Sequence, residues 1–376
     1  MRPERLRPDN FTPPTRTPWG GRKLLTRLKR DLRLDADVIG ESWEVSVEPS
    51  FPSRVEGTGQ TLRDLIAADP VGWLGDSVAA RYGQSPLLVK LLDAADNLSV
   101  QVHPAPDDPA LASDESGKPE SWIVLDAEPG AGIYLGLREG VERRHVERCL
   151  DEGGALDELL NFVPAIPGEA WIIEAGTIHA IGGGVTVIEP QHVAPGRRGL
   201  TYRFWDWNRR YDAEGHLDPG GVPRPLHVER SLAVTRWGGP RGDAFVESCR
   251  SRPVAIQAAS RLSDPISAIR GAGASAATIG AATGGADASG AAAIGAARVR
   301  VVRTDWFEAE RWSGDGPLRV LADTMIALTC VAGAVRVDTP LGALDLTCGH
   351  SGVVPAAAGH LDIRLHAAEV FAAWSR

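Results

Sequence analysis

The sequence predicts a mainly β protein built from two related barrels, with a small helical insertion in the first. Short apolar runs rich in Val, Ile and Trp recur at strand length, among them SWIVLDA, AWIIEA and VTVIEP. The chain contains 42 glycines and 27 prolines, which supply the turns between such strands. A weak internal repeat, described below, indicates two copies of one unit, and 376 residues suffice for two domains.

Helical spacing of apolar residues is confined to a few segments. These are residues 61–68, 71–82 and 141–160, and in the last of them Val141, His145, Cys149 and Leu150 can share one face. We therefore expect helices inserted into a β framework, with the main insertion around residues 141–165.

A change of composition divides the chain. Residues 271–298 hold 7 glycines and 13 alanines among 28 residues. Such a segment has few side chains whose burial could offset the conformational entropy lost when the chain becomes ordered. This pattern predicts a flexible linker or an expanded loop. The predicted domains are residues 1–245 with the functional site, a connecting segment 246–298, and a degenerate C-terminal barrel 299–376.

Composition excludes several classes of protein. The net charge is −9, from 40 Lys and Arg against 49 Asp and Glu, which argues against a nucleic-acid binder. No apolar run approaches the length of a membrane span, and the four cysteines are too widely spaced for a disulfide framework. We expect a cytoplasmic protein with reduced thiols, either a monomer or a small homo-oligomer, that binds neither membranes nor nucleic acid.

The internal repeat pairs a turn glycine with a histidine eleven positions later. Its two copies are Gly168, Glu174, Gly176 and His179, and then Gly349, Pro355, Ala357 and His360. In both copies an apolar strand follows the glycine, and a tight turn precedes the histidine. This register resembles the second motif of the cupins, small β-barrels that hold a metal or ligand in the barrel mouth.

Candidate metal ligands cluster around the first copy. Gln101 and His103 are two positions apart in the strand-like run SVQVHP, so they share a face, and Ser99 lies on the same side. Glu120 and His179 follow beside other predicted strands. Two imidazoles, a carboxylate and an amide oxygen suit Zn²⁺, Fe²⁺, Mn²⁺ or Co²⁺. Taken singly, each of these residues could instead have a purely structural role in packing.

The C-terminal copy offers no such set. The run MIALTCVAGAVRV, where ligands should precede His360, contains no histidine and no glutamate. We therefore expect a packing or covering role for that barrel.

Several segments together resemble the type I mannose-6-phosphate isomerase (phosphomannose isomerase) family, in its shorter bacterial form. In order, they are PWGGRKL, GESWEVS, PLLVKLLDAADNLSVQVHP, GKPESWIVLDAEPGAGIYLG, PGEAWIIEAGTIHAIGGGVTVIEPQ and TYRFWDWNR. They span about the first 210 residues. The segment HVAPGRRGL before the last of them is longer than the family pattern, so Arg197 or Arg198 could reach the site.

The resemblance implies a role for each matching residue. The metal, usually zinc in this family, would be bound by Gln101, His103, Glu120 and His179; the active site would include Arg203, Lys118 and Glu189; and the substrate phosphate would contact Lys90 and Ser99. The phosphate-binding role of Lys90 has support that does not depend on the resemblance, because a lysine within the apolar run PLLVKLL needs an anionic partner. The identity of the catalytic base stays open between Lys118 and a carboxylate.

The resemblance therefore implies a metal-dependent aldose–ketose isomerase that interconverts mannose 6-phosphate and fructose 6-phosphate through an enediol. Two other functions suit the same residues. An Fe²⁺ cupin dioxygenase also uses histidine and carboxylate ligands, although phosphate-binding cations argue against it. A non-catalytic cupin that binds sugars is the second alternative.

Overall fold

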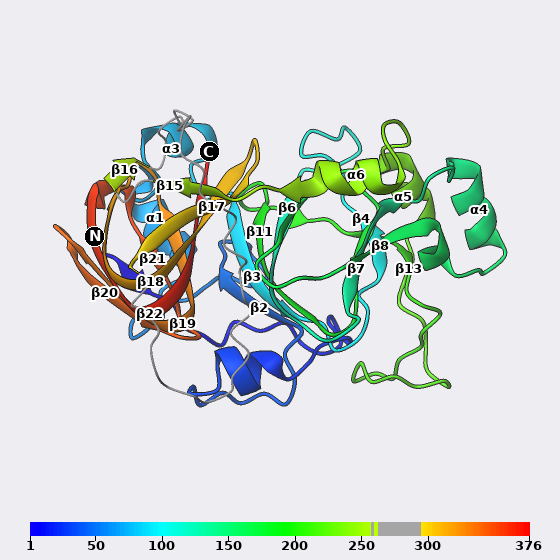
Figure 1. Ribbon diagram of the computed structural model, residues 1–376, viewed down its shortest axis with the longest axis horizontal. Helices are drawn as coiled ribbons and strands as arrows, with labels where there is room; N and C mark the ends of the chain where they lie inside the picture. Colours follow the sequence, from blue (N-terminus) through cyan, green and yellow to red (C-terminus); the bar gives the residue numbers. More distant parts are fainter. Residues whose placement is uncertain (257–258, 262–294) are drawn as a thin grey trace.

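The computed structural model describes residues 1–256, 259–261 and 295–376. Two β-rich halves lie side by side, one formed mainly by the middle of the chain and the other mainly by its C-terminal part (Figure 1). Most of the predicted Ala/Gly-rich linker, residues 271–294, lies outside the described residues. The predicted division into residues 1–245, 246–298 and 299–376 stays a prediction.

The first half is a sandwich of two antiparallel sheets. One sheet contains β14 (Arg250–Ser251), β9 (Ala170–Ile173), β6 (Glu120–Ala127), β11 (Val185–His192), β3 (Leu87–Asp93) and β2 (Glu41–Val45), in that spatial order. The facing sheet contains β13 (Tyr202–Trp205), β4 (Val100–Val102), β10 (His179–Ile181), β7 (Gly132–Leu137) and β8 (Leu160–Pro164). A separate short pair joins β12 (Arg198–Gly199) to β5 (Glu115–Ser116).

The six-stranded sheet is buried on both faces, which explains its continuous apolar runs. On β6, Trp122 and Val124 belong to the core between the two sheets, whereas Ile123 belongs to the core shared with the second half. On β11, Val187 and Ile188 divide in the same way. Because successive side chains of a strand alternate between its faces, polar residues at the inward positions must lie inside the sandwich.

The second half is a single nine-stranded sheet. Its strands are β1 (Glu4–Arg5), β21 (Ser351–Val354), β19 (Ile326–Thr339), β22 (His360–Ser375), β18 (Phe307–Leu321), β17 (Ala297–Arg303) and β15 (Val254–Ile256), with β16 (Ala259–Arg261) on β18 and β20 (Gly342–Thr347) on β19. The predicted mainly β class is confirmed. Within the described ranges, however, no run of paired strands closes on itself, so neither half is a closed barrel.

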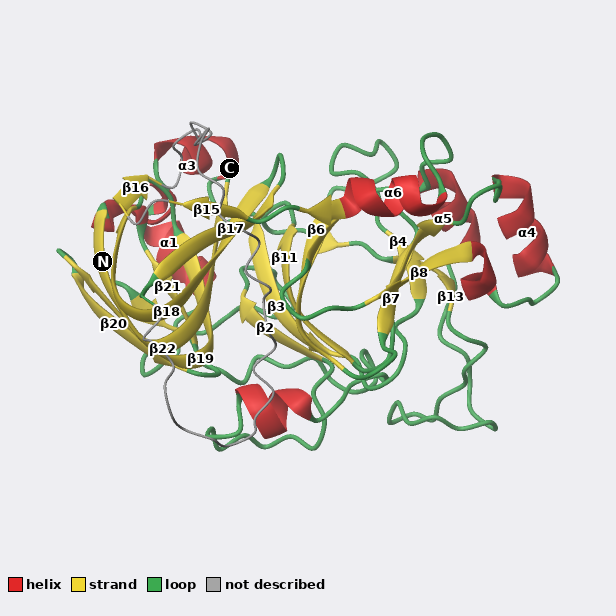
Figure 2. Ribbon diagram, in the orientation of Figure 1, coloured by secondary structure: helices red, strands yellow, loops and turns green. Residues whose placement is uncertain are grey.

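Helices lie outside the sheets (Figure 2). They are α1 (Leu62–Ala68), α2 (Pro70–Leu74), α3 (Asp76–Tyr82), α4 (Arg143–Asp151), α5 (Val228–Val234) and α6 (Gly242–Cys249), with short turns η1 (Leu24–Leu28), η2 (Leu156–Leu159) and η3 (Ala356–Ala358).

The sequence placed α1 to within one residue, because Thr61 caps it by accepting a hydrogen bond from the Asp64 amide at 3.1 Å. The predicted helix over 71–82 is divided at Gly75, where φ is 78°. The predicted helix over 141–160 is shorter than expected, since α4 ends at Asp151. The sequence did not predict α5 and α6.

A buried ion pair joins the two halves. Lys29 Nζ lies 2.8 Å from Glu44 Oε1, and the two side chains are 0% and 2% exposed. Ser351 in β21 donates a hydrogen bond of 2.7 Å to the other carboxylate oxygen. The Lys29 ammonium also donates to the Gly349 carbonyl oxygen at 3.1 Å, so strand β2 is fixed against the C-terminal sheet.

Two further sequence expectations concern the thiols and membrane spans. Cys149, Cys249, Cys330 and Cys348 are free thiols, as expected. In the part of the chain that the structure describes, every helix is too short or too polar to span a lipid bilayer.

Candidate metal centre and adjoining cavity

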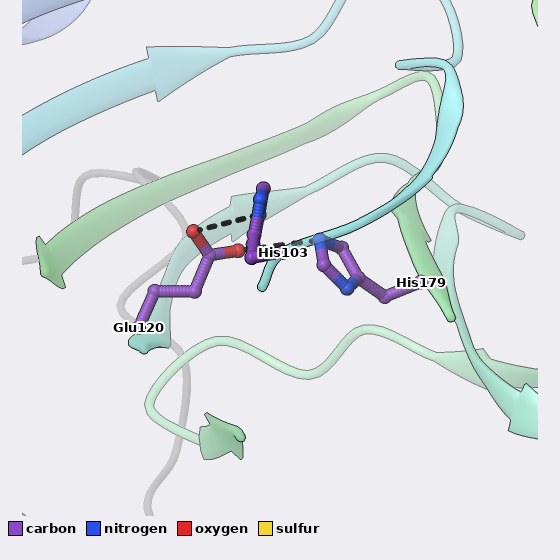
Figure 3. Close-up of side chains that lie close together, drawn as sticks. All are labelled: His103, Glu120 and His179. Atoms are coloured by element: carbon purple, nitrogen blue, oxygen red, sulfur yellow. Dashed lines mark ion pairs between the residues drawn. The ribbon is translucent and has the colours of Figure 1, made fainter. Parts of the chain in front are cut away.

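Three buried side chains, at the starts of β6 and β10 and just after β4, meet inside the sandwich (Figure 3). Glu120 Oε2 lies 3.3 Å from His103 Nε2, and Glu120 Oε1 lies 3.4 Å from His179 Nε2. The ligand atoms of the three residues all lie within 4.8 Å of one another. One ion could therefore contact all three.

Strand register brings these residues together. His103 follows β4, Glu120 begins β6 and His179 begins β10. In the five-stranded sheet, His179 pairs directly with Gln101, so the side chains of Gln101, His103 and His179 share the inward face. Glu120 reaches them from the opposite sheet.

Backbone carbonyls orient both imidazoles. His103 Nδ1 lies 2.9 Å from the Leu200 carbonyl oxygen, and His179 Nδ1 lies 2.9 Å from the Thr177 carbonyl oxygen. Since a carbonyl can only accept, each Nδ1 carries the proton and each Nε2 directs a lone pair toward Glu120. Burial lowers the pKa of both histidines, that of His179 to about 3, so both rings are neutral near pH 7.

The carboxylate at the centre is ionised. Burial alone would raise the pKa of Glu120, but the neighbouring Lys118 ammonium lowers it below its ordinary value. Lys118 Nζ lies 3.3 Å from Glu120 Oε2.

The arrangement fits a divalent cation. His103 Nε2 and Glu120 Oε1 are buried, and neither has a hydrogen-bond partner among the described residues. Orphaned lone pairs of this kind are costly unless something binds them. Two neutral imidazoles and one carboxylate form a donor set that suits zinc and the neighbouring divalent metals.

Gln101 lies at the edge of this group. Its Nε2 lies 3.3 Å from His179 Nε2, and its Oε1 accepts a hydrogen bond of 3.3 Å from Ser99 Oγ. A half-turn of the amide would direct Oε1 toward the same point as the other three donors.

A cavity of about 330 Å³ reaches this group through Gln101, Lys118 and Gln191, which line it and contact His179 or Glu120. All six of the other predicted site residues line it: Lys90, Ser99, Gln101, Lys118, Glu189 and Arg203. Arg198, from the longer segment noted in the sequence, also lines it. The structure therefore brings every predicted site residue to this one region.

Lys90 lies between two carboxylates on one wall of the cavity. Its Nζ is 3.6 Å from Glu41 Oε2 and 3.6 Å from Glu189 Oε2, and the lysine side chain is 5% exposed. Trp122 Nε1 donates a hydrogen bond of 3.0 Å to Glu189 Oε1. Burial, reinforced by the nearby Glu120 carboxylate, raises the pKa of Glu189 to about 8.

Arg203 lies beside the histidine face. It pairs with Gln101 across β13 and β4, and its Nη1 donates to the Pro225 carbonyl oxygen at 2.9 Å. Burial and the neighbouring Arg224 lower the pKa of Arg203 to about 10, so it remains a cation at neutral pH.

Several polar residues of the cavity wall were not predicted from the sequence, among them Arg16, Glu41, Glu48, Gln191 and Arg224. A signal existed for two of them. Glu41 lies two positions before Trp43, and Gln191 lies two positions after Glu189, so each shares a strand face with another cavity residue. Nothing in the local sequence marks Arg16 or Arg224.

Comparison with known proteins identifies a single family. The model of the type I phosphomannose isomerase catalytic domain matches residues 16–127. A mannose-6-phosphate isomerase from Streptococcus mutans is 34% identical over 228 residues, which are 59% of this chain and 65% of that protein. ManA of Bacillus subtilis, also named mannose-6-phosphate isomerase, is 37% identical over 226 residues, covering 57% and 64% of the two chains. The matches thus span a little under two thirds of these two relatives.

A further relative and a solved structure support the same family. The YvyI protein of Bacillus subtilis is 31% identical over 241 residues, which are 62% of this chain and 69% of that protein. The crystal structure of mannose 6-phosphate isomerase from Bacillus subtilis superposes over 99% of both chains with a TM-score of 0.72 and 21% identity, so the two proteins share a fold. The chain belongs to the type I phosphomannose isomerase family.

Proposed function

We propose that this protein is a metal-dependent aldose–ketose isomerase that interconverts mannose 6-phosphate and fructose 6-phosphate. One observation carries the proposal: two neutral imidazoles and an ionised glutamate meet at buried, orphaned donor atoms beside a cavity with acidic and basic walls. Family membership points to the same reaction.

The metal in this proposal is zinc, bound by His103, Glu120 and His179 with the Gln101 amide oxygen as the fourth donor. The three-residue group and the position of Gln101 beside His179 support this set. A bound divalent ion would act as a Lewis acid that stabilises negative charge developing on a sugar oxygen.

The reaction moves a proton between C1 and C2 of the sugar, so it needs a group that accepts and returns a proton. Glu189 suits this task because its pKa is raised to about 8, near the working pH of such a base. Lys118 is the second candidate, and its Nζ lies 3.3 Å from Glu120 Oε2. Arg203 would hold a positive charge close to the reacting oxygens, as its pairing with Gln101 supports.

We assign the substrate phosphate to the Lys90 and Ser99 side of the cavity, since both residues line it. Lys90 also neutralises the Glu41 carboxylate and lies 3.6 Å from Glu189, so a dianion there needs additional cations. Arg16 and Arg224 line the same cavity and can supply them. Replacement of Lys90 by Ala should raise KM for mannose 6-phosphate more than it lowers kcat.

A coupled assay of fructose 6-phosphate formation tests the proposal. Purified protein should convert mannose 6-phosphate, lose this activity on treatment with a strong chelator, and regain it when Zn²⁺ is added. Full activity after complete metal removal would contradict the mechanism. Oxygen consumption with an organic substrate would indicate the Fe²⁺ dioxygenase, and binding of mannose 6-phosphate without turnover would indicate a sugar-binding protein.

A further inference from the structure

Gln191 occupies an inward position on β11 for which the sequence analysis assigned no role. Its side chain is 0% exposed and lines the cavity. It pairs directly with Glu120 across β11 and β6, just as Glu189, two positions earlier, pairs with Lys90 on β3. A fully buried amide needs one hydrogen-bond partner for its N–H donor and another for its carbonyl acceptor.

The donor end of the amide faces the central carboxylate. Gln191 Nε2 donates a hydrogen bond of 2.7 Å to Glu120 Oε2. The same oxygen lies 3.3 Å from the Lys118 ammonium, so it can only accept, and the amide nitrogen must face it. The other carboxylate oxygen, Oε1, has no hydrogen-bond partner among the described residues. Gln191 thus fixes one oxygen of Glu120 and leaves the other available.

The acceptor end of the amide is unused. Gln191 Oε1 is buried without a hydrogen-bond partner in the described part of the chain. Its orientation is set by the hydrogen bond that Nε2 makes, so the amide cannot turn to satisfy it without losing Glu120. Because Gln191 lines the cavity, a hydroxyl of a ligand bound there is the best candidate to satisfy this oxygen.

We propose that Gln191 links the metal site to the substrate: its amide N–H holds Glu120 in position for the metal, and its carbonyl oxygen accepts a hydrogen bond from a hydroxyl of the bound sugar. The second contact rests on the proposed function. The first contact requires only that Glu120 binds a metal. Gln191 is therefore a positioning residue toward the metal and a binding residue toward the sugar.

Metal affinity measured without any sugar tests the first contact. Gln191→Met removes the donor and the acceptor at similar volume, whereas Gln191→Glu removes the donor and keeps an acceptor. Ser121→Ala is the matched control, because Ser121 adjoins Glu120 on β6 but, by alternation, faces the other side of the sheet and is also fully buried.

Zn²⁺ affinity would be measured by competition with a chelating dye. Both Gln191 variants should bind Zn²⁺ about 10- to 100-fold more weakly, and Ser121→Ala should bind it as the wild type does. Unchanged Zn²⁺ affinity in a Gln191→Met protein, whether or not its melting temperature falls, would overturn the positioning role.

Calorimetry at saturating Zn²⁺ tests the second contact, with mannose 6-phosphate and inorganic phosphate as probes. Gln191→Met should bind mannose 6-phosphate about tenfold more weakly and inorganic phosphate as the wild type does. Gln191→Glu should change the affinities for the two probes by the same factor, because its extra charge repels both and its acceptor remains.

Equal affinity of wild type and Gln191→Met for mannose 6-phosphate would overturn the sugar contact alone. Wild-type protein that holds Zn²⁺ but binds no mannose 6-phosphate would overturn the proposed function together with the sugar contact. The Zn²⁺ competition would then still decide the contact with Glu120.

Discussion

Lys90 and Glu189 face each other across neighbouring strands β3 and β11, with the ammonium nitrogen 3.6 Å from a carboxylate oxygen. Glu41 lies at the same distance on the other side of the lysine. Lys90 therefore neutralises the Glu41 carboxylate, whose pKa is lowered, and lies beside Glu189, whose pKa burial raises to about 8.

Replacement of Lys90 by Met should destabilise the protein, because it leaves the largely buried Glu41 carboxylate without its cation. Removal of one partner of a buried ion pair costs about 3–5 kcal/mol. Urea unfolding should show a lower free energy of unfolding, and the double variant Lys90→Met with Glu41→Gln should recover part of the loss. A Lys90→Met protein as stable as the wild type would show that Lys90 does not neutralise Glu41.

Replacement of His179 by Ala should remove the metal and the isomerase activity together. The His179 ring is 0% exposed and directs Nε2 toward Glu120, so no neighbouring residue can take its place. Elemental analysis should find far less metal per chain, and the coupled assay should find activity reduced by at least about a thousandfold. Full metal content with lost activity would instead assign His179 a direct role on the sugar.

The ion pair between Lys29 and Glu44 should contribute strongly to stability, because both side chains are buried at the contact between the halves. Replacement of Lys29 by Met should cost about 3–5 kcal/mol in the free energy of unfolding. The exposed pair Arg143 and Glu147 on α4 is the control, and its removal should cost less than about 1 kcal/mol. Equal losses for the two pairs would contradict the assigned role of burial.

Much of the metal site could be predicted from the sequence, because strand alternation is local. Gln101 and His103 are two positions apart, so the period of a strand alone places them on one face. The position of His179 followed from its motif. Whether these residues meet Glu120 depends on how the two sheets face each other. The family resemblance predicted this meeting, whereas residue spacing alone could not.

Contacts between distant strands could not be predicted. The pairing of Gln191 with Glu120 depends on the register of β11 against β6, and that register shifts at an irregularity between Thr186 and Val187. Lys29 and Glu44 meet only because the N-terminal segment packs between the two halves. The helices α5 and α6 were missed because they are short and their apolar faces are small.

Acid should destabilise the protein partly through His192. This ring packs against Tyr82 and Trp306, and burial, together with the charge of Arg81, lowers its pKa to about 4. Below about pH 6.5 the unfolded chain binds a proton that the folded protein does not accept until about pH 4, so stability falls as the pH drops through this window.

Between pH 7.5 and pH 5 this single group should cost about 2 kcal/mol. Replacement of His192 by Phe keeps an aromatic ring at the position and should reduce the loss of stability over that range by the same amount. Thermal or urea unfolding of both proteins at several pH values measures the difference. Parallel pH profiles for the two proteins would mean that His192 titrates normally.

Anomalous diffraction from a crystal of the zinc-loaded protein tests the central claim most directly. The account predicts one strong zinc peak per chain, about 2.0–2.2 Å from the Nε2 atoms of His103 and His179 and from one carboxylate oxygen of Glu120. A zinc-loaded and active protein whose only peak lies away from these three side chains would contradict it.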